Sequence, residues 1–164
     1  MFKKYHCIKQ HDSIDCADAC LTTICRQYGS KIPITRIREI ACSDRRGTSA
    51  YGLVKAAEEL DFTARVVRGD ETSLFERFPV PCIAHIVTDE NMLHYVVIHK
   101  VTKKHIVVTD PGKGIVKHTH GDFLKIWTGV LILMLPTQKF VKKDQIKGLF
   151  SRYLNLLTPH RFFS

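Results

Sequence analysis

The hydrophobic positions in the first third of the chain recur every three or four residues, which is the spacing of one helix face. This pattern predicts a first helix over residues 16–28, with Asp15 as its N-cap and Gly29 as its stop. A second helix is expected to begin near Pro33, with the isoleucines that follow facing inward.

A third helix is expected after a loop over residues 44–47. Either Thr48 or Ser49 is placed to cap it, because a hydroxyl immediately before a helical apolar pattern accepts a bond from the first turn. The inward face of this helix is expected to carry Leu53, Ala56, Ala57 and Leu60.

From residue 62 onward the pattern changes to alternation and short apolar runs, which are typical of strands. Strands are expected over residues 62–67, 82–87, 93–101, 105–109, 115–118 and 130–135. Short helical segments are expected over residues 72–78 and 122–127. Helices followed by mostly antiparallel strands indicate an α+β fold, with the N-terminal helices packed on an antiparallel sheet.

A chain of 164 residues with 45% hydrophobic residues is expected to form one domain with a packed core. The longest apolar run, residues 130–135, is far shorter than the roughly 20 residues that cross a bilayer, and we expect no secretory signal at the N-terminus. Pro136 ends the compact pattern. We therefore expect a domain over residues 1–137 and a basic amphipathic tail or linker over residues 138–164.

The formal charge of +9 is compatible with an ordinary basic surface, or with attraction to an acidic peptide, an anionic membrane face or nucleic acid. Much of the excess lies late in the chain, at Lys139, Lys142, Lys143, Lys147, Arg152 and Arg161. That placement favours local attachment by the tail, and we expect no nucleic-acid partner.

The cysteine spacing does not fit a compact disulfide scaffold, and it contains no Cys-x-x-Cys pair of the kind that binds zinc. We therefore expect mostly reduced thiols in a cytosolic setting, with one cysteine available for chemistry and no metal. The six cysteines are Cys7, Cys16, Cys20, Cys25, Cys42 and Cys82.

Four residues together suggest nucleophilic catalysis by a thiol. Cys16, in the first turn of a helix, is the candidate nucleophile, because helix dipoles favour a thiolate there. His94 is the candidate base and Asp110 its orienting acid, since antiparallel pairing of their strands brings them to one end of the sheet. Gln10 is the candidate oxyanion donor. Taken singly, each residue is more often structural.

These residues lie in a series of longer motifs. They are Gln-His-Asp-x-x-Asp-Cys at 10–16, Ala-Cys-Leu at 19–21, Arg-x-Gly-Thr-Ser-x-Tyr-Gly-Leu at 45–53, Leu-His-Tyr-Val-Val-Ile at 93–98, Asp-Pro-Gly-Lys-Gly-Ile-Val at 110–116 and Phe-Leu-x-Ile-Trp-Thr-Gly at 123–129. With these motifs the chain, over residues 5–137, resembles the cysteine peptidase domain of bacteriocin-processing ABC transporters, the double-glycine leader peptidases.

The resemblance implies a papain-like fold with Cys16 as nucleophile, His94 as general base and acid, Asp110 as its orienter and Gln10 at the oxyanion. It also implies cleavage after a double-glycine-type motif in the leader of a secreted peptide, which binds as an amphipathic helix. The chain departs from the family in having Ala17-Asp18 where two small residues are usual. The substrate-groove residues are not assigned.

The family's setting implies further partners, namely the membrane-spanning and nucleotide-binding domains of a transporter, at the cytoplasmic side of a bacterial membrane. We expect the peptidase domain to need no cofactor, with ATP used by the transporter domains, and to be soluble when isolated. Two alternatives stay open: a catalytically silent module that binds leaders, and a thiol acyltransferase or amidase with the same triad.

Overall fold

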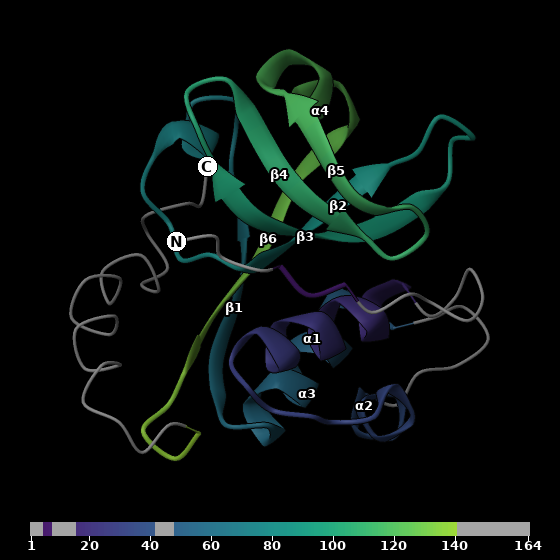
Figure 1. The fold of residues 1–164 in the computed structure, drawn as a ribbon, viewed down its shortest axis with the longest axis vertical. Coiled ribbons are helices and arrows are strands. Elements are labelled where there is room, and N and C mark those ends of the chain that lie inside the picture. Colours follow the sequence, from purple (N-terminus) through teal and green to yellow (C-terminus); the bar gives the residue numbers. More distant parts are fainter. Residues whose placement is uncertain (1–4, 8–15, 42–47, 141–164) are drawn as a thin grey trace.

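The computed structural model describes residues 5–7, 16–41 and 48–140 (Figure 1). Three α-helices come first, and strands predominate from residue 62 onward. The helices are α1 (Cys16–Gln27), α2 (Ile34–Ala41), α3 (Ala50–Glu59) and α4 (His120–Ile126), with a 3-10 turn η2 (Ser73–Phe75). The strands are β1 (Phe62–Arg68), β2 (Cys82–Val87), β3 (Leu93–Val101), β4 (His105–Asp110), β5 (Gly114–Thr119) and β6 (Trp127–Pro136).

The six strands form one sheet in the order β1-β6-β2-β3-β4-β5, and every neighbouring pair is antiparallel. In Figure 1, α1, α2 and α3 gather in the lower half of the molecule, whereas β2 to β5 and α4 form the upper half. The predicted α+β class, with N-terminal helices on an antiparallel sheet, is confirmed.

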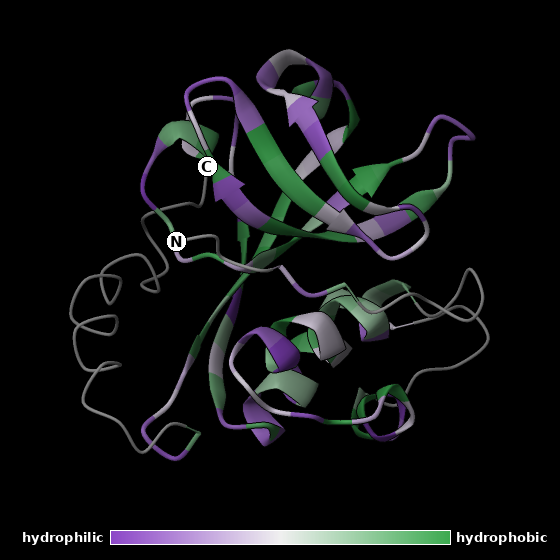
Figure 2. Ribbon diagram, viewed as in Figure 1, coloured by the Kyte–Doolittle hydropathy of each residue, from purple (hydrophilic) through white to green (hydrophobic). Residues whose placement is uncertain are grey.

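The sheet separates two hydrophobic clusters. One cluster lies between the sheet and helices α1 to α3 and includes Leu21, Leu53 and Ile83, while the other, on the α4 side, includes Ile98 and Phe123. Strand β6 is covered on both faces, because its alternate residues belong to different clusters. This explains why residues 130–135 are continuously apolar instead of alternating. Figure 2 shows a similar hydrophobic middle and hydrophilic ends in β4.

Helix α1 is more deeply buried than its one-sided pattern predicts. All residues from Cys16 to Cys25 are buried, because α2 and α3 pack on one side and β3 on another. Small side chains such as Ala19 and Cys20 allow neighbours to approach from several directions. The helix that carries the candidate nucleophile is thus held by both halves of the molecule.

The predicted helices and strands are present, but several of them begin or end at other residues than predicted. Ser49, and not Thr48, caps α3, and its hydroxyl accepts from the Gly52 N–H at 3.0 Å. The helical segment expected over 72–78 is reduced to η2, and that over 122–127 begins earlier, with Thr119 as N-cap. The Asp15 cap and the 44–47 loop lie outside the described residues.

At the end of the described chain, Phe140 packs against Phe62, with ring centroids 4.7 Å apart. The packed part of the molecule therefore extends to the first residues of the segment expected to be a tail. No helix in the described ranges has the length and apolar character to cross a membrane.

Because β6 is buried on both faces, we predict that shortening one of its side chains destabilises the fold. We expect Ile132→Ala to lower the free energy of unfolding by about 2–5 kcal/mol, because Ile132 is fully buried against the helices and its removal leaves a cavity. Ile115→Ala is the matched control, since Ile115 is 50% exposed on β5 and should cost about 0.5 kcal/mol or less. Urea denaturation measures both; equal losses would contradict this account of the core.

Candidate active site

Cys16 is the first residue of α1, and its side chain is almost covered, with 8% of the residue exposed. The helix runs from this position across the sheet and packs against β3. The N–H groups of a first helical turn have no partner within the helix and present a partial positive charge. The fold therefore sets the thiol at an electropositive helix end that faces the strand bearing His94.

His94 and Asp110 lie on adjacent antiparallel strands, as predicted. Val97 of β3 pairs with Thr109 of β4, so one further step along the register sets Asp110 beside Val96. His94 then lies two residues away on the same face of the sheet, a diagonal position that long side chains can span. Its Nε2 is 2.8 Å from Asp110 Oδ1.

The Asp-Pro-Gly turn holds the Asp110 carboxylate in place. The Gly112 N–H donates to the same Oδ1 at 2.8 Å, and the Lys113 N–H donates to the Asp110 carbonyl at 3.0 Å. Burial raises the pKa of Asp110, but the hydrogen bonds from His94 and Gly112 and the nearby positive charges outweigh it, so the pKa is lowered overall. The carboxylate is ionised and accepts the His94 Nε2–H.

The His94 ring is held ready to carry a positive charge. Burial alone lowers its pKa, but hydrogen bonds to the side chains of Asp110 and Cys16, together with their negative charges, raise the pKa to about 9. Since Nε2 is bonded to Asp110, the other ring nitrogen, Nδ1, is left for the thiol. Cys16, His94 and Asp110 thus form a connected series.

Three other histidines lie on strands β2, β3 and β4, and two of them have hydrogen-bond partners other than a carboxylate. His85 Nδ1 bonds Thr128 Oγ1 at 3.0 Å, and its pKa is lowered by burial and by the charge of His94. His99 is buried and its Nε2 bonds Thr109 Oγ1 at 2.7 Å, whereas His105 is exposed at the start of β4. Among the histidines of the described ranges, His94 is the one that pairs with a carboxylate at hydrogen-bond distance.

Three further cysteines in the described part of the chain belong to the core. Cys20, Cys25 and Cys82 are reduced and fully buried. Burial raises the pKa of each thiol, to about 12 for Cys25, and the charge of Cys16 adds to the effect at Cys20. They behave as small apolar side chains, as the sequence predicts.

Gln10, the fourth candidate, lies outside the described residues. Residues 5–7, which come shortly before it in the chain, are held by hydrogen bonds to both α1 and β4. The His6 N–H donates to Gln27 Oε1 at 3.0 Å, and Thr109 Oγ1 donates to the His6 carbonyl at 3.2 Å. The Tyr5 ring stacks on His99 at 4.6 Å. Sequence reasoning missed this anchor, because polar side chains inside apolar strands carry no periodic signal.

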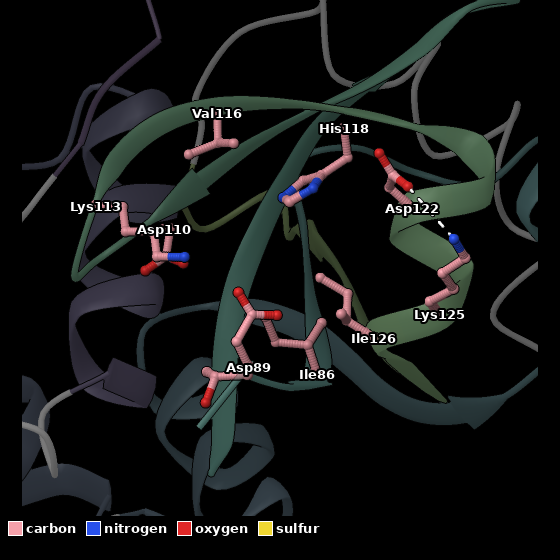
Figure 3. A pocket seen from close by; sticks show the side chains of 10 residues that line it. Ile86, Asp89, Asp110, Lys113, Val116, His118, Asp122, Lys125 and Ile126 are labelled. Carbon is pink, nitrogen blue, oxygen red and sulfur yellow. Dashed lines mark ion pairs between the residues drawn. The ribbon is translucent and has the colours of Figure 1, made fainter. Parts of the chain in front are cut away.

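Two hollows flank the His94–Asp110 pair. One, of about 300 Å³, includes Leu93 and His94 in its lining, and the other, of about 310 Å³, reaches α4. They share Asp110 and Lys113 as lining residues, so together they make one extended depression. Figure 3 shows Asp110 and Lys113 at one end of the second hollow and Lys125 at the other. Leu93 is 70% exposed beside the site.

A thiol at a helix start, an imidazole on a facing strand and a carboxylate behind it, on this α+β fold, define a papain-like cysteine peptidase. The model of the family described as "Peptidase C39 family" matches residues 4–139. The chain belongs to the peptidase C39 family, and it is a cysteine peptidase domain.

Relatives and solved structures agree with this assignment. The lactococcin-G-processing and transport ATP-binding protein LagD of Lactococcus lactis is 42% identical over 81% of this chain and 19% of that protein. The peptidase domain of Streptococcus ComA, a bifunctional ABC transporter involved in quorum sensing, has a TM-score of 0.76 and 29% identity over 82% of this chain and 100% of that chain.

A double-glycine-motif protease from an AMS/PCAT transporter, solved in complex with its leader peptide, has a TM-score of 0.75 and 28% identity. The match covers 82% of this chain and 93% of that chain. The chain spans about a fifth of the length of the transporters it matches.

The raised pKa of His94 predicts a pH-dependent coupling. In Asp110→Ala the ring loses a hydrogen bond and a negative charge, so we expect its pKa to fall from about 9. The pKa of His94 in the folded state, about 9, lies above the usual 6.5. The pair therefore stabilises the folded state fully below pH 6.5, and this stabilisation is lost as the pH rises through 9.

NMR titration of His94, with urea unfolding at several pH values, measures both effects. We expect the difference in unfolding free energy between wild type and Asp110→Ala to shrink from pH 7 to pH 10, above the His94 pKa of about 9. An unchanged His94 titration in the variant would show that Asp110 does not control the ring.

Proposed function

We propose that this domain is the peptidase of a peptide-export system and removes the N-terminal leader of a secreted peptide after a double-glycine-type motif. The observation that carries the proposal is the 2.8 Å bond between His94 and Asp110, in the neighbourhood of Cys16, which helps to raise the pKa of the same ring. Such a connected thiol, imidazole and carboxylate are the parts needed for acyl transfer from a peptide bond.

In the proposed mechanism, His94 takes the proton of Cys16, and the sulfur attacks the carbonyl carbon of the second glycine of the pair. The C–N bond breaks as His94 returns the proton to the leaving amine, which frees the core peptide. A water molecule then donates a proton to His94 and attacks the thioester, which releases the leader and regenerates the thiol. Asp110 keeps the ring oriented and offsets its charge throughout.

The oxyanion formed in both steps needs hydrogen-bond donors. The backbone N–H of Cys16, at the start of α1, is one donor in the proposal, and the side-chain NH₂ of Gln10 is the other. Removing a donor of this kind typically costs about 2.7–4 kcal/mol of transition-state stabilisation. Gln10 stays a sequence-based assignment that site-directed substitution can test.

The relatives support the choice of substrate. Their names describe bacteriocin or peptide processing together with transport, and one structural neighbour was solved with a leader peptide bound. The leader is proposed to bind as an amphipathic helix, with its C-terminal glycines entering a narrow cleft that excludes side chains. The depression that flanks His94 gives room for peptide beside the scissile bond.

The wider setting is also a proposal. The peptidase domain would precede the membrane-spanning and nucleotide-binding domains of an ABC transporter, at the cytoplasmic face of a bacterial membrane, as in the relatives that are named transport ATP-binding proteins. The thiol mechanism uses no cofactor, and ATP would be used by the transporter domains alone.

The first test replaces the nucleophile. Cys16→Ala should lower cleavage of a double-glycine precursor by more than about 1,000-fold, because the acyl-enzyme cannot form. Leader binding, followed by fluorescence anisotropy of a labelled leader, should change little, since the substitution removes one atom from a buried position. Full turnover by this variant would end the assignment of Cys16.

The same assay separates the two rival functions. If the domain were a silent binding module, the wild-type domain would bind the leader, and mass spectrometry would show no new fragment. An acyltransferase or amidase would give a product joined to an added amine, or would release ammonia, instead of a hydrolysed leader. The intact Cys16–His94–Asp110 connection favours hydrolysis over a silent module.

The basic segment 138–164 is proposed to act outside the chemistry, near the anionic membrane surface or the transporter. Ending the chain after Phe140, which keeps its packing on Phe62, should leave cleavage of a soluble leader within about threefold of wild type. Mass spectrometry of the products measures this. A loss as large as that of Cys16→Ala would contradict a peripheral role.

A further inference from the structure

Asp18 is a fully buried carboxylate in the first turn of α1, two residues after Cys16. A buried carboxyl group is costly unless hydrogen bonds compensate it, so the groups that bond to Asp18 bear on its role.

One partner of this carboxyl group comes from outside α1. Thr48 Oγ1 donates to Asp18 Oδ1 at 2.6 Å, in a contact buried from solvent. Short bonds of a hydroxyl to a carboxylate are among the stronger side-chain hydrogen bonds. Asp18 is further fixed through its backbone, because Thr22 Oγ1 donates to its carbonyl at 2.7 Å.

Thr48 itself has little freedom to move. It directly precedes Ser49, the N-cap of α3, and is 8% exposed. The space around it is narrow: a Cβ added to Gly52 would lie 3.2 Å from Thr48 Cγ2 and 2.9 Å from the Ala41 carbonyl at the end of α2. The bond therefore ties the first turn of α1 to the junction of α2 and α3.

This tie bears on catalysis because the reacting groups come from different layers. Cys16 belongs to the helical layer, whereas His94 and Asp110 belong to the sheet. Both the direction of the Cys16 thiol and that of its backbone N–H follow the orientation of the first turn of α1. Small misplacements of reacting groups cost large factors in rate.

We propose that Asp18 is a positioning residue: its bond to Thr48 holds the first turn of α1 so that Cys16 meets His94 in reactive geometry. The role does not depend on which peptide is cleaved, but it does rest on the cysteine-peptidase activity of the domain. Two acids are buried in the described residues, Asp18 and Asp110. The proposed chemistry uses Asp110 directly, and this proposal gives Asp18 a role.

The test compares three variants of the full chain. Thr48→Val removes the donor and keeps the shape, and should lower kcat for a double-glycine peptide by about ten- to a hundredfold, with KM changed less than about twofold. Asp18→Asn keeps an oxygen that accepts from Thr48, and should retain kcat within about threefold. Ser49→Ala is the control: it weakens the α3 cap next door but leaves the Asp18 bond intact.

If the role of Thr48 were merely structural, Ser49→Ala and Thr48→Val would lower the thermal midpoint similarly and both would keep kcat. That result would overturn the proposal, as would an Asp18→Asn variant as slow as Thr48→Val, because charge and not the bond would then matter. The kcat loss in Thr48→Val at assay temperatures well below its midpoint would support it.

A second measurement avoids the peptide substrate. The rate of Cys16 alkylation by iodoacetamide, followed residue by residue in mass spectrometry, should fall several-fold in Thr48→Val and stay unchanged in Ser49→Ala, since reactivity depends on the His94 contact. If wild type cleaves no leader, the proposed function fails while this comparison still decides the role of Asp18. Equal alkylation rates in wild type and Thr48→Val would reject that role.

Discussion

The hydrogen bond between His94 and Asp110 is the interaction on which the chemistry proposed for this domain depends. Burial of the imidazole disfavours its charged form, and the carboxylate reverses that preference. The bond exists because β3 and β4 are antiparallel neighbours, so the start of one strand lies beside the end of the other. The antiparallel pairing of β3 and β4 is thus one cause of the raised pKa of His94.

The surrounding fold keeps this pair in place from several sides. The Gly112 N–H locks the shared Asp110 oxygen, and the Thr109 hydroxyl, next along β4, links His99 to the backbone of His6. The sheet that bears the pair is packed on both faces. The proposed active site, built on such a base, would lose little energy to reorganisation when charge develops.

Much of this was predictable from sequence. The order of elements followed from the change of apolar spacing near residue 62, and the meeting of His94 with Asp110 followed from antiparallel pairing alone. Sequence did not predict the burial of Asp18 or its bond to Thr48, because hydrogen bonds between residues 30 positions apart leave no local pattern. Helix ends were misplaced where side chains competed for backbone N–H groups, as Asp70 does ahead of η2.

The division of the reacting groups between two layers has a further consequence. Cys16 belongs to the helical layer and His94 to the sheet, so the seam between the two layers runs through the proposed catalytic centre. A molecule wedged into that seam, or a local melting that loosened it by an ångström or two, would silence the enzyme while both layers stayed folded. Measures of bulk secondary structure would not detect inhibition of this kind.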